Sequence, residues 1–284
     1  MSENAYILKL SCHDKPGIVA AVTTALASRG ANIVESNQFW DRQTNQFFLR
    51  IAFSTPANVD REGLELALRP STDRFDMKLK VEDLSRKPKI IIMVSKFDHA
   101  MLHLLYQIKV GWLNAEVVAI VSNHEDSRRA AEHEGIPYHS WKVTKDNKAE
   151  QEEKLVDLVR ETGAELVVLA RYMQVLSNEL CSRLKGKAIN IHHSFLPSFK
   201  GAKPYAQAHQ RGVKLIGATA HFVTGDLDEG PIIEQDVERV DHSMDADTLS
   251  AIGRDVECVV LARAVKWFTE HRILQNGHRT VIFK

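Results

Sequence analysis

Cysteine is scarce in this chain: there are three among 284 residues, Cys12, Cys181 and Cys258. They lie far apart and form no Cys-x-x-Cys pair, which argues against a disulfide framework and against a zinc site built on thiolates. Isolated cysteines of this kind are typical of proteins in a reducing compartment. The sequence therefore predicts a cytoplasmic protein.

Long apolar runs and an excess of one charge are also missing. No run approaches the roughly 20 residues of a membrane-spanning helix, and the N-terminal residues MSENAYILKLS lack the features of a signal peptide. Lysine plus arginine equals aspartate plus glutamate at 37 each. We therefore expect neither a membrane nor a nucleic acid as partner. The 44% of hydrophobic residues suits one large domain or two ordinary ones.

The first 84 residues alternate between strand and helix patterns. An apolar helical period follows the turn at His13-Asp-Lys-Pro-Gly17 and ends near Gly30, and a second helix is expected to end at Pro70. The expected elements are strand 6–11, helix 18–29, strands 31–40 and 46–53, helix 60–68 and strand 77–81. This βαββαβ order predicts a ferredoxin-like domain over residues 1–84.

A short basic stretch containing a proline, residues 85–89, predicts a linker to a second domain over residues 90–284. Ile90–Val94 has the continuous apolar character of a buried parallel strand. Further strands are expected at 116–121, 136–139, 166–169 and 280–283, and helices at 99–110, 127–134, 149–162, 177–184 and 245–270. The alternation predicts an α/β domain with a doubly wound, mostly parallel sheet.

Two strand ends in this second domain carry polar side chains. Asn190 and His192 end a short apolar strand and, being two residues apart, point to the same side of it. An amide and an imidazole on one face can together stabilise an oxyanion. The second segment, 218–231, places His221 and Asp228 after another apolar run. Because open α/β sheets bind ligands beyond the carboxyl ends of their strands, we expect one site here.

These motifs resemble those of the formyl-transfer family that uses 10-formyltetrahydrofolate. The family's Asn-x-His motif and the turn that follows it match Asn190, His192 and Ser194–Pro197, and its catalytic aspartate matches Asp228. The resemblance covers residues 89–284 and implies that 10-formyltetrahydrofolate is the substrate, with no prosthetic group. It implies catalytic roles for Asn190, His192 and Asp228, and a folate pocket formed by Gln174, Val175, Leu176, His221, Gly225 and Asp226. As an alternative, Asp226 is a turn former or a solvent-facing residue.

The N-terminal segment resembles an ACT domain. The matching residues are Asp14–Ile18, which open the first helix, and Gly30–Ile33, which enter the second strand. ACT domains pair side by side and often bind amino acids, so the resemblance implies a homo-oligomer, dimer or tetramer, with an amino-acid effector. The implied effector residues are Asp14, Pro16, Gly17, Ile18, Asn32 and Ile33. A purely oligomerising module without a ligand is the alternative.

Hydrolysis and transfer to an amine are the two reactions open to this family. Family members that formylate glycinamide ribonucleotide hold its phosphate on a glycine-rich loop after the first strand. Here that stretch is Ser95-Lys-Phe-Asp-His-Ala100, which has no glycine and carries Asp98, although Lys96 is an alternative phosphate ligand. The run Phe199–Tyr205 resembles the hydrolytic branch, in which Lys200 and Lys203 would bind the folate tail or cover the site. We therefore expect water as acceptor, with formate and tetrahydrofolate as products feeding one-carbon and purine metabolism; the alternative is a formyltransferase to a small amine.

A metal-dependent amidohydrolase and a non-catalytic sensor of folate or amino acids are further alternatives. His192, His193, His221, Asp226 and Asp228 are all possible metal ligands. No His-Glu-x-x-His pair accompanies them, and we expect His192 and His193 on opposite faces of a strand. The sequence predicts no metal site.

Overall fold

The computed structural model describes residues 3–197 and 204–284, which form two compact units. Unit 1 contains the chain up to Lys87 together with Glu270–Lys284, and unit 2 contains Pro88–Thr269. Lys200 and Lys203 lie outside the described residues. In the described chain, no helix combines the length and the apolar character needed to cross a membrane.

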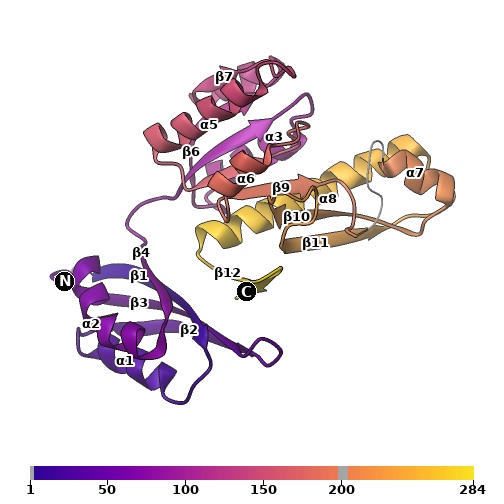
Figure 1. Cartoon of the computed structure of the whole chain (residues 1–284). Coiled ribbons are helices and arrows are strands. Elements are labelled where there is room, and N and C mark those ends of the chain that lie inside the picture. Colours follow the sequence, from indigo (N-terminus) through magenta and orange to yellow (C-terminus); the bar gives the residue numbers. More distant parts are fainter. Residues whose placement is uncertain (1–2, 198–203) are drawn as a thin grey trace. The chain divides into compact units, whose positions relative to one another are not determined.

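Unit 1 is built on a four-stranded antiparallel sheet in the order β2-β3-β1-β4. Its strands are β1 (Glu3–His13), β2 (Asn32–Asp41), β3 (Gln46–Pro56) and β4 (Lys78–Asp83). Its helices, α1 (Ile18–Ala27) and α2 (Arg61–Phe75), lie side by side on one face of this sheet (Figure 1). The predicted ferredoxin-like βαββαβ order is confirmed.

Helix α2 continues five residues beyond the predicted stop at Pro70. Proline lacks the N–H of a helical hydrogen bond, so an interior position is costly. Packing outweighs this cost here, because Leu64, Leu68 and Phe75 all point into the core of unit 1 at helical spacing. The helix ends instead at Asp76, whose left-handed backbone (φ 50°) breaks the helical path.

The C-terminal residues, predicted as part of the second domain, pack in unit 1. β12 (Ile273–Asn276), which was not predicted, pairs with β13 (Arg279–Ile282) as a two-stranded antiparallel sheet. Phe48 of β3 packs with Leu274 and Phe283 in a separate hydrophobic cluster. This contact explains why five consecutive residues of β3, from Phe47 to Ile51, are buried: helices cover one side chain and the C-terminal hairpin the next.

Polar contacts also hold the C-terminal hairpin in unit 1. Buried Arg50 on β3 binds Glu35 at 3.1 Å and the carbonyl oxygen of Glu270 at 3.1 Å. Asp41 accepts hydrogen bonds from Asn276 at 2.6 Å and Arg279 at 2.7 Å. A buried arginine is stable only when its charge is paired, so these contacts help to hold the hairpin against β3.

Unit 2 contains a seven-stranded sheet in the order β11-β10-β9-β8-β5-β6-β7. β5 to β9 run parallel, and β10 and β11 are antiparallel, which confirms the mostly parallel α/β fold. The strands are β5 (Lys89–Val94), β6 (Glu116–Ser122), β7 (Tyr138–Ser140), β8 (Leu166–Leu169), β9 (Ala188–His192), β10 (Leu215–Phe222) and β11 (Ile232–Arg239). The helices are α3 (His99–Lys109), α4 (Arg128–His133), α5 (Lys148–Thr162), α6 (Asn178–Arg183), α7 (Pro204–Arg211) and α8 (Ala246–Thr269).

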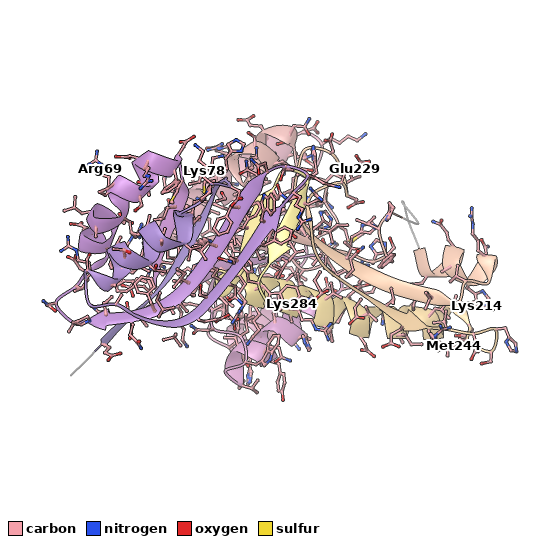
Figure 2. All side chains as sticks on the ribbon, turned by 90° about the horizontal axis from the view of Figure 1, so that it is seen from below. Arg69, Lys78, Lys214, Glu229, Met244 and Lys284 are labelled. Atoms are coloured by element: carbon pink, nitrogen blue, oxygen red, sulfur yellow. The ribbon has the colours of Figure 1, made fainter. Side chains whose placement is uncertain are left out.

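Side chains from both faces of this sheet form the core of unit 2. Ile91 and Met93 of β5 pack with Leu155 of α5 and Leu180 of α6, whereas α8 packs against β9 and β10. A smaller cluster beneath α7 includes Met244, which Figure 2 labels near Lys214 at one end of unit 2. The central strands are therefore rigid supports for side chains at their ends.

We predict that Phe48→Ala destabilises unit 1 by about 3–5 kcal/mol, because the substitution leaves a cavity between β3 and the hairpin. Native-state hydrogen exchange at the amides of β3 measures this loss. Leu66→Ala, at a site on α2 that is 63% exposed, is the control and should change exchange little. Equal protection of β3 in both variants would contradict a packed hairpin.

Candidate active site

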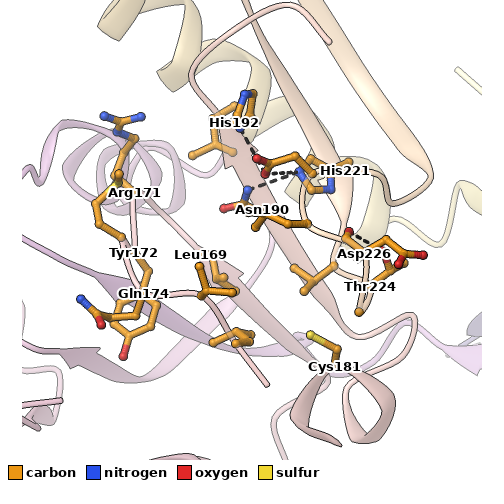
Figure 3. A pocket seen from close by; sticks show the side chains of 18 of the residues that line it. Leu169, Arg171, Tyr172, Gln174, Cys181, Asn190, His192, His221, Thr224 and Asp226 are labelled. Atoms are coloured by element: carbon orange, nitrogen blue, oxygen red, sulfur yellow. Dashed lines mark hydrogen bonds and ion pairs between the residues drawn. The ribbon is translucent and has the colours of Figure 1, made fainter. Parts of the chain in front are cut away.

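Asn190 and His192 lie two residues apart on β9, and both line one cavity of about 240 Å³ (Figure 3). β9 lies between parallel β8 and antiparallel β10, with Asn190 opposite Leu169 on one side and His221 on the other. Alternation along the strand places the two polar side chains on the same face. The His192 side chain is 6% exposed, so its ring is held in a largely water-free setting.

The orientation of the Asn190 amide is set by His221 across the strand pair. Nδ1 of His221 lies 2.9 Å from the carbonyl oxygen of Phe222, so Nδ1 carries a proton and donates. Nε2 of the neutral ring then accepts a hydrogen bond from Nδ2 of Asn190, at 3.3 Å. Burial lowers the pKa of His221 and so favours this neutral form.

Asp228 is brought to His192 by a tight turn after β10. Its Oδ1 lies 3.2 Å from Nδ1 of His192 and 3.8 Å from Nε2 of His221. The hydrogen bond with His192 holds the pKa of Asp228 below its usual value, although burial opposes this. Asp228 has a left-handed backbone (φ 59°), and a Cβ on Gly230 would stand 1.7 Å from the carbonyl oxygen of Phe222. Only glycine allows the turn to close this tightly.

Strand direction differs from the sequence expectation. β10 runs antiparallel to β9, so its carboxyl end is not at the same edge as the carboxyl end of β9. Asn190 and His221 meet because they are cross-strand partners, and Asp228 reaches His192 because the turn folds back. Asp226 also lies in this turn rather than on an extended strand, and it lines the cavity together with Asp228.

The six residues predicted to contact folate all line this cavity. Gln174, Val175 and Leu176 come from the segment after β8, and His221, Gly225 and Asp226 come from β10 and its turn. Figure 3 shows Gln174 with Tyr172 on one side and Thr224 with Asp226 on the other. The segment after β8 is fixed by buried Ser95, whose hydroxyl accepts from the N–H of Met173 at 3.0 Å and donates to Asn123 at 2.7 Å.

Arg171, Tyr172, Cys181 and His193 also line the cavity. The sequence predicted no role here for the first three, and His193 was considered only as a possible metal ligand. His192 and His193 were expected on opposite faces, but β9 ends at His192 and the chain bends there. The two rings are therefore neighbours, with centroids 5.1 Å apart. Arg171 has a left-handed backbone (φ 65°), which no local sequence signal announces. Burial raises the pKa of Tyr172 to about 12, so its hydroxyl stays protonated.

The rival metal site does not assemble within the described residues. His192, His221 and Asp228 approach one another, but residues 3–197 and 204–284 contain no group of three or more histidine, cysteine, aspartate or glutamate side chains arranged to hold a metal ion. Instead, the nitrogens of the two rings are committed to the protein hydrogen bonds described above, apart from Nε2 of His192. That atom is buried and has no hydrogen-bond partner in the described chain.

The residues predicted for an effector lie at two separate places in unit 1. Asp14, Pro16, Gly17 and Ile18 form the turn that opens α1, with Gly17 in a left-handed conformation (φ 94°). Asn32 begins β2 and pairs with Ser54 of β3, which pairs on its other side with Ala5 of β1. The turn follows His13, eight residues further along β1, so Asn32 and Ile33 lie about 27 Å from it. Within one protomer these residues do not form one site.

Comparisons with known proteins match two different parts of the chain to two families. A formyl transferase family model matches residues 88–265, and an ACT domain model matches residues 6–68. Formyltetrahydrofolate deformylase of Corynebacterium sp. (strain P-1) is 48% identical, with all of both chains covered. The crystal structure of the Burkholderia mallei deformylase is 51% identical with a TM-score of 0.95, covering 99% of this chain and all of that one.

The likeness to transferases is narrower. Glycinamide ribonucleotide transformylase 1 of Symbiobacterium toebii has a TM-score of 0.66 at 25% identity, covering 71% of this chain and 97% of that one. The deformylases match both units, including the ACT domain. The chain therefore belongs to the formyltetrahydrofolate deformylase family.

Proposed function

We propose that this protein hydrolyses 10-formyltetrahydrofolate to formate and tetrahydrofolate. The observation that carries the proposal is the meeting of Asn190, His192 and Asp228 in one cavity, in a chain that is similar to deformylases over its whole length. No prosthetic group takes part, and the folate is the substrate. Formate released in this way would supply one-carbon metabolism and purine synthesis.

Hydrolysis of the N10-formyl group requires stabilisation of an oxyanion and a proton for the departing N10. Asn190 has a second amide N–H besides the one bound to His221, and this N–H is the donor for the formyl oxygen. Nε2 of His192 is buried and has no hydrogen-bond partner among the described residues, so it supplies the second donor and later the proton for N10. Buried donors of this kind act strongly because the surroundings are poorly polarisable.

Asp228 has two roles in this mechanism. Its Oδ1 pairs with Nδ1 of His192 and stabilises the protonated imidazole that donates to N10. Its Oδ2 has no hydrogen-bond partner among residues 3–197 and 204–284 and is the acceptor that orients the attacking water. The six folate residues place the flat pterin between the segment after β8 and the turn after β10, where backbone groups read its polar edge.

The start of α3 is unsuited to the phosphate of an amine acceptor. Ser95 is buried and occupied by Asn123 and Met173, and Asp98 precedes the first turn of the helix. His99 binds the buried carboxylate of Glu257 at 2.8 Å. Asp98 at this position would repel a phosphate dianion, which disfavours transfer to a small amine and leaves water as the nucleophile.

Localisation, assembly and effector binding extend the proposal. Three unpaired cysteines and a folate-dependent reaction suit the cytoplasm. The ACT domain would bind an amino acid and pair with a second copy, giving a dimer or tetramer. Because Asn32 and Ile33 lie far from the Asp14–Ile18 turn in one protomer, an effector contacting both sets would have to lie between two protomers.

We predict that replacing Asn190, His192 or Asp228 singly by alanine lowers formate release by about a hundredfold or more, with the melting temperature little changed. The three residues act on one transition state, so the double variants should lose less than the product of the single losses. Near-normal turnover by Asp228→Asn, at an unaltered melting temperature, would rule out the role of the carboxylate.

We predict that purified protein releases formate from 10-formyltetrahydrofolate without an amine acceptor. Added glycinamide ribonucleotide should neither speed turnover nor become formylated, since Asp98 at the start of α3 would repel its phosphate. Both products are measurable in one assay by mass spectrometry. Strict dependence of formate release on an amine would instead establish a transferase.

We predict that one amino acid gives a saturable calorimetric signal with the intact protein and binds at least tenfold more weakly to Asp14→Ala. In this proposal the carboxylate of Asp14 pairs with the ammonium group of the amino acid. The N–H groups at the start of α1, which no side chain caps, bind its carboxylate. Asp73→Ala, at an exposed site on α2, is the matched control. A flat response to every common amino acid would leave the ACT domain with assembly alone.

A further inference from the structure

His193 lies in the active-site cavity but has no role in the mechanism above. It directly follows β9, and its ring centroid lies 5.1 Å from that of His192 and 6.5 Å from that of Tyr205. Among residues 3–197 and 204–284, neither ring nitrogen of His193 has a hydrogen-bond partner. The side chain is only partly buried, so these nitrogens are open to a water molecule in the cavity.

Charged groups from several elements determine the protonation state of His193. Burial, Arg171 and His192 lower its pKa to about 4, against the opposing effect of Glu257 and Asp228. Arg171 comes from the segment after β8, His192 from β9, Asp228 from the turn after β10, Glu257 from α8 and the neutral Tyr205 from α7. At neutral pH the ring is therefore uncharged and offers a lone pair.

The Arg171 charge lies beside a buried carboxylate, Glu257, with which it forms an ion pair. Nε of Arg171 lies 3.4 Å from Oε2 of Glu257, whose side chain is 1% exposed. Glu257 also accepts from the hydroxyl of Tyr205 at 2.7 Å and binds Nε2 of His99 at 2.8 Å. Burial alone would raise the pKa of Glu257, but these hydrogen bonds and the Arg171 charge outweigh it and keep the carboxylate ionised. Moving the guanidinium away from His193 would therefore cost its ion pair with a buried carboxylate.

The hydrolytic cycle requires two proton transfers that His192 and Asp228 cannot both complete. The attacking water must lose a proton, and N10 must gain one from His192, which then has to be protonated again. Protonating Asp228 would break its ion pair with His192 at the moment when that pair stabilises the imidazolium. A second base beside His192 resolves this conflict.

We propose that His193 is a catalytic base that takes the proton of the attacking water and returns it to His192. As the water oxygen bonds to the formyl carbon, one water O–H bond breaks and its proton passes to His193. The C–N10 bond then breaks, and N10 takes the proton of His192. The proton on His193 moves to His192, directly or through a water, and formic acid leaves and ionises in solution. The charges of Asp228 and Arg171 both favour this direction.

The inference rests on the proposed hydrolysis, and variants of His193 test it separately. His193→Phe keeps a ring of similar size but has no nitrogen, and His193→Ala opens space for added imidazole. We expect each to lower kcat by about a hundredfold or more with KM changed less than threefold. Imidazole should restore at least a tenth of the lost rate to His193→Ala, and the rescue should decline as imidazole becomes protonated below about pH 6.5–7.

Histidine 103 on α3 provides the matched control, because burial lowers its pKa too but it lies outside the cavity. His103→Gln should keep wild-type kcat. Near-normal kcat in His193→Phe would show that the ring only packs and would overturn the inference while leaving the hydrolysis intact. A loss in His193→Ala that imidazole does not restore would equally overturn it. Absence of formate release by the wild-type protein would refute the proposed function itself.

Discussion

The contact between His192 and Asp228 is the interaction on which the rest of the site depends. It joins a residue at the end of a buried strand to a residue in a turn that folds back from the neighbouring strand. The turn closes only because Gly230 has no side chain and Asp228 adopts a left-handed backbone. The contact between His192 and Asp228 in a largely water-free cavity offsets the cost of this strained backbone, since buried charges are stable only when paired.

The candidate catalytic residues were predictable because short sequence motifs and strand alternation reveal them. Asn190 and His192 share a face through the two-residue alternation of a strand, which holds whatever the strand pairs with. The relation of Asn190 to His221 was not predictable, because it depends on the direction and register of β10. His193 was misplaced for a similar reason: alternation applies only while the strand continues, and β9 ends one residue earlier.

Most of the fold was predictable from apolar periodicity and turn residues, and the exceptions are tertiary. Helix α2 passes through Pro70 because Phe75 gains a place in the core beyond it. The C-terminal hairpin joins unit 1 through Phe48 and Arg50, which look like ordinary strand residues in the sequence. The buried network around Glu257 draws on α3, α7, α8 and the segment after β8, so no single stretch of sequence reveals it. Such tertiary contacts determine where a helix ends or what covers a strand, but the neighbouring sequence does not reveal them.

The return of the chain to unit 1 has a consequence for biosynthesis. A ribosome makes residues 88–269 between the two segments of this unit, so β3 emerges long before its covering hairpin. Folding during synthesis generally proceeds from the N-terminus, domain by domain. Here the sheet of unit 1 cannot complete its packing until the catalytic unit has been synthesised, and until then the apolar side chain of Phe48 is uncovered. The nascent chain thus exposes an apolar face of its first sheet while the catalytic unit is made, and the hairpin that follows this unit in the sequence covers that face.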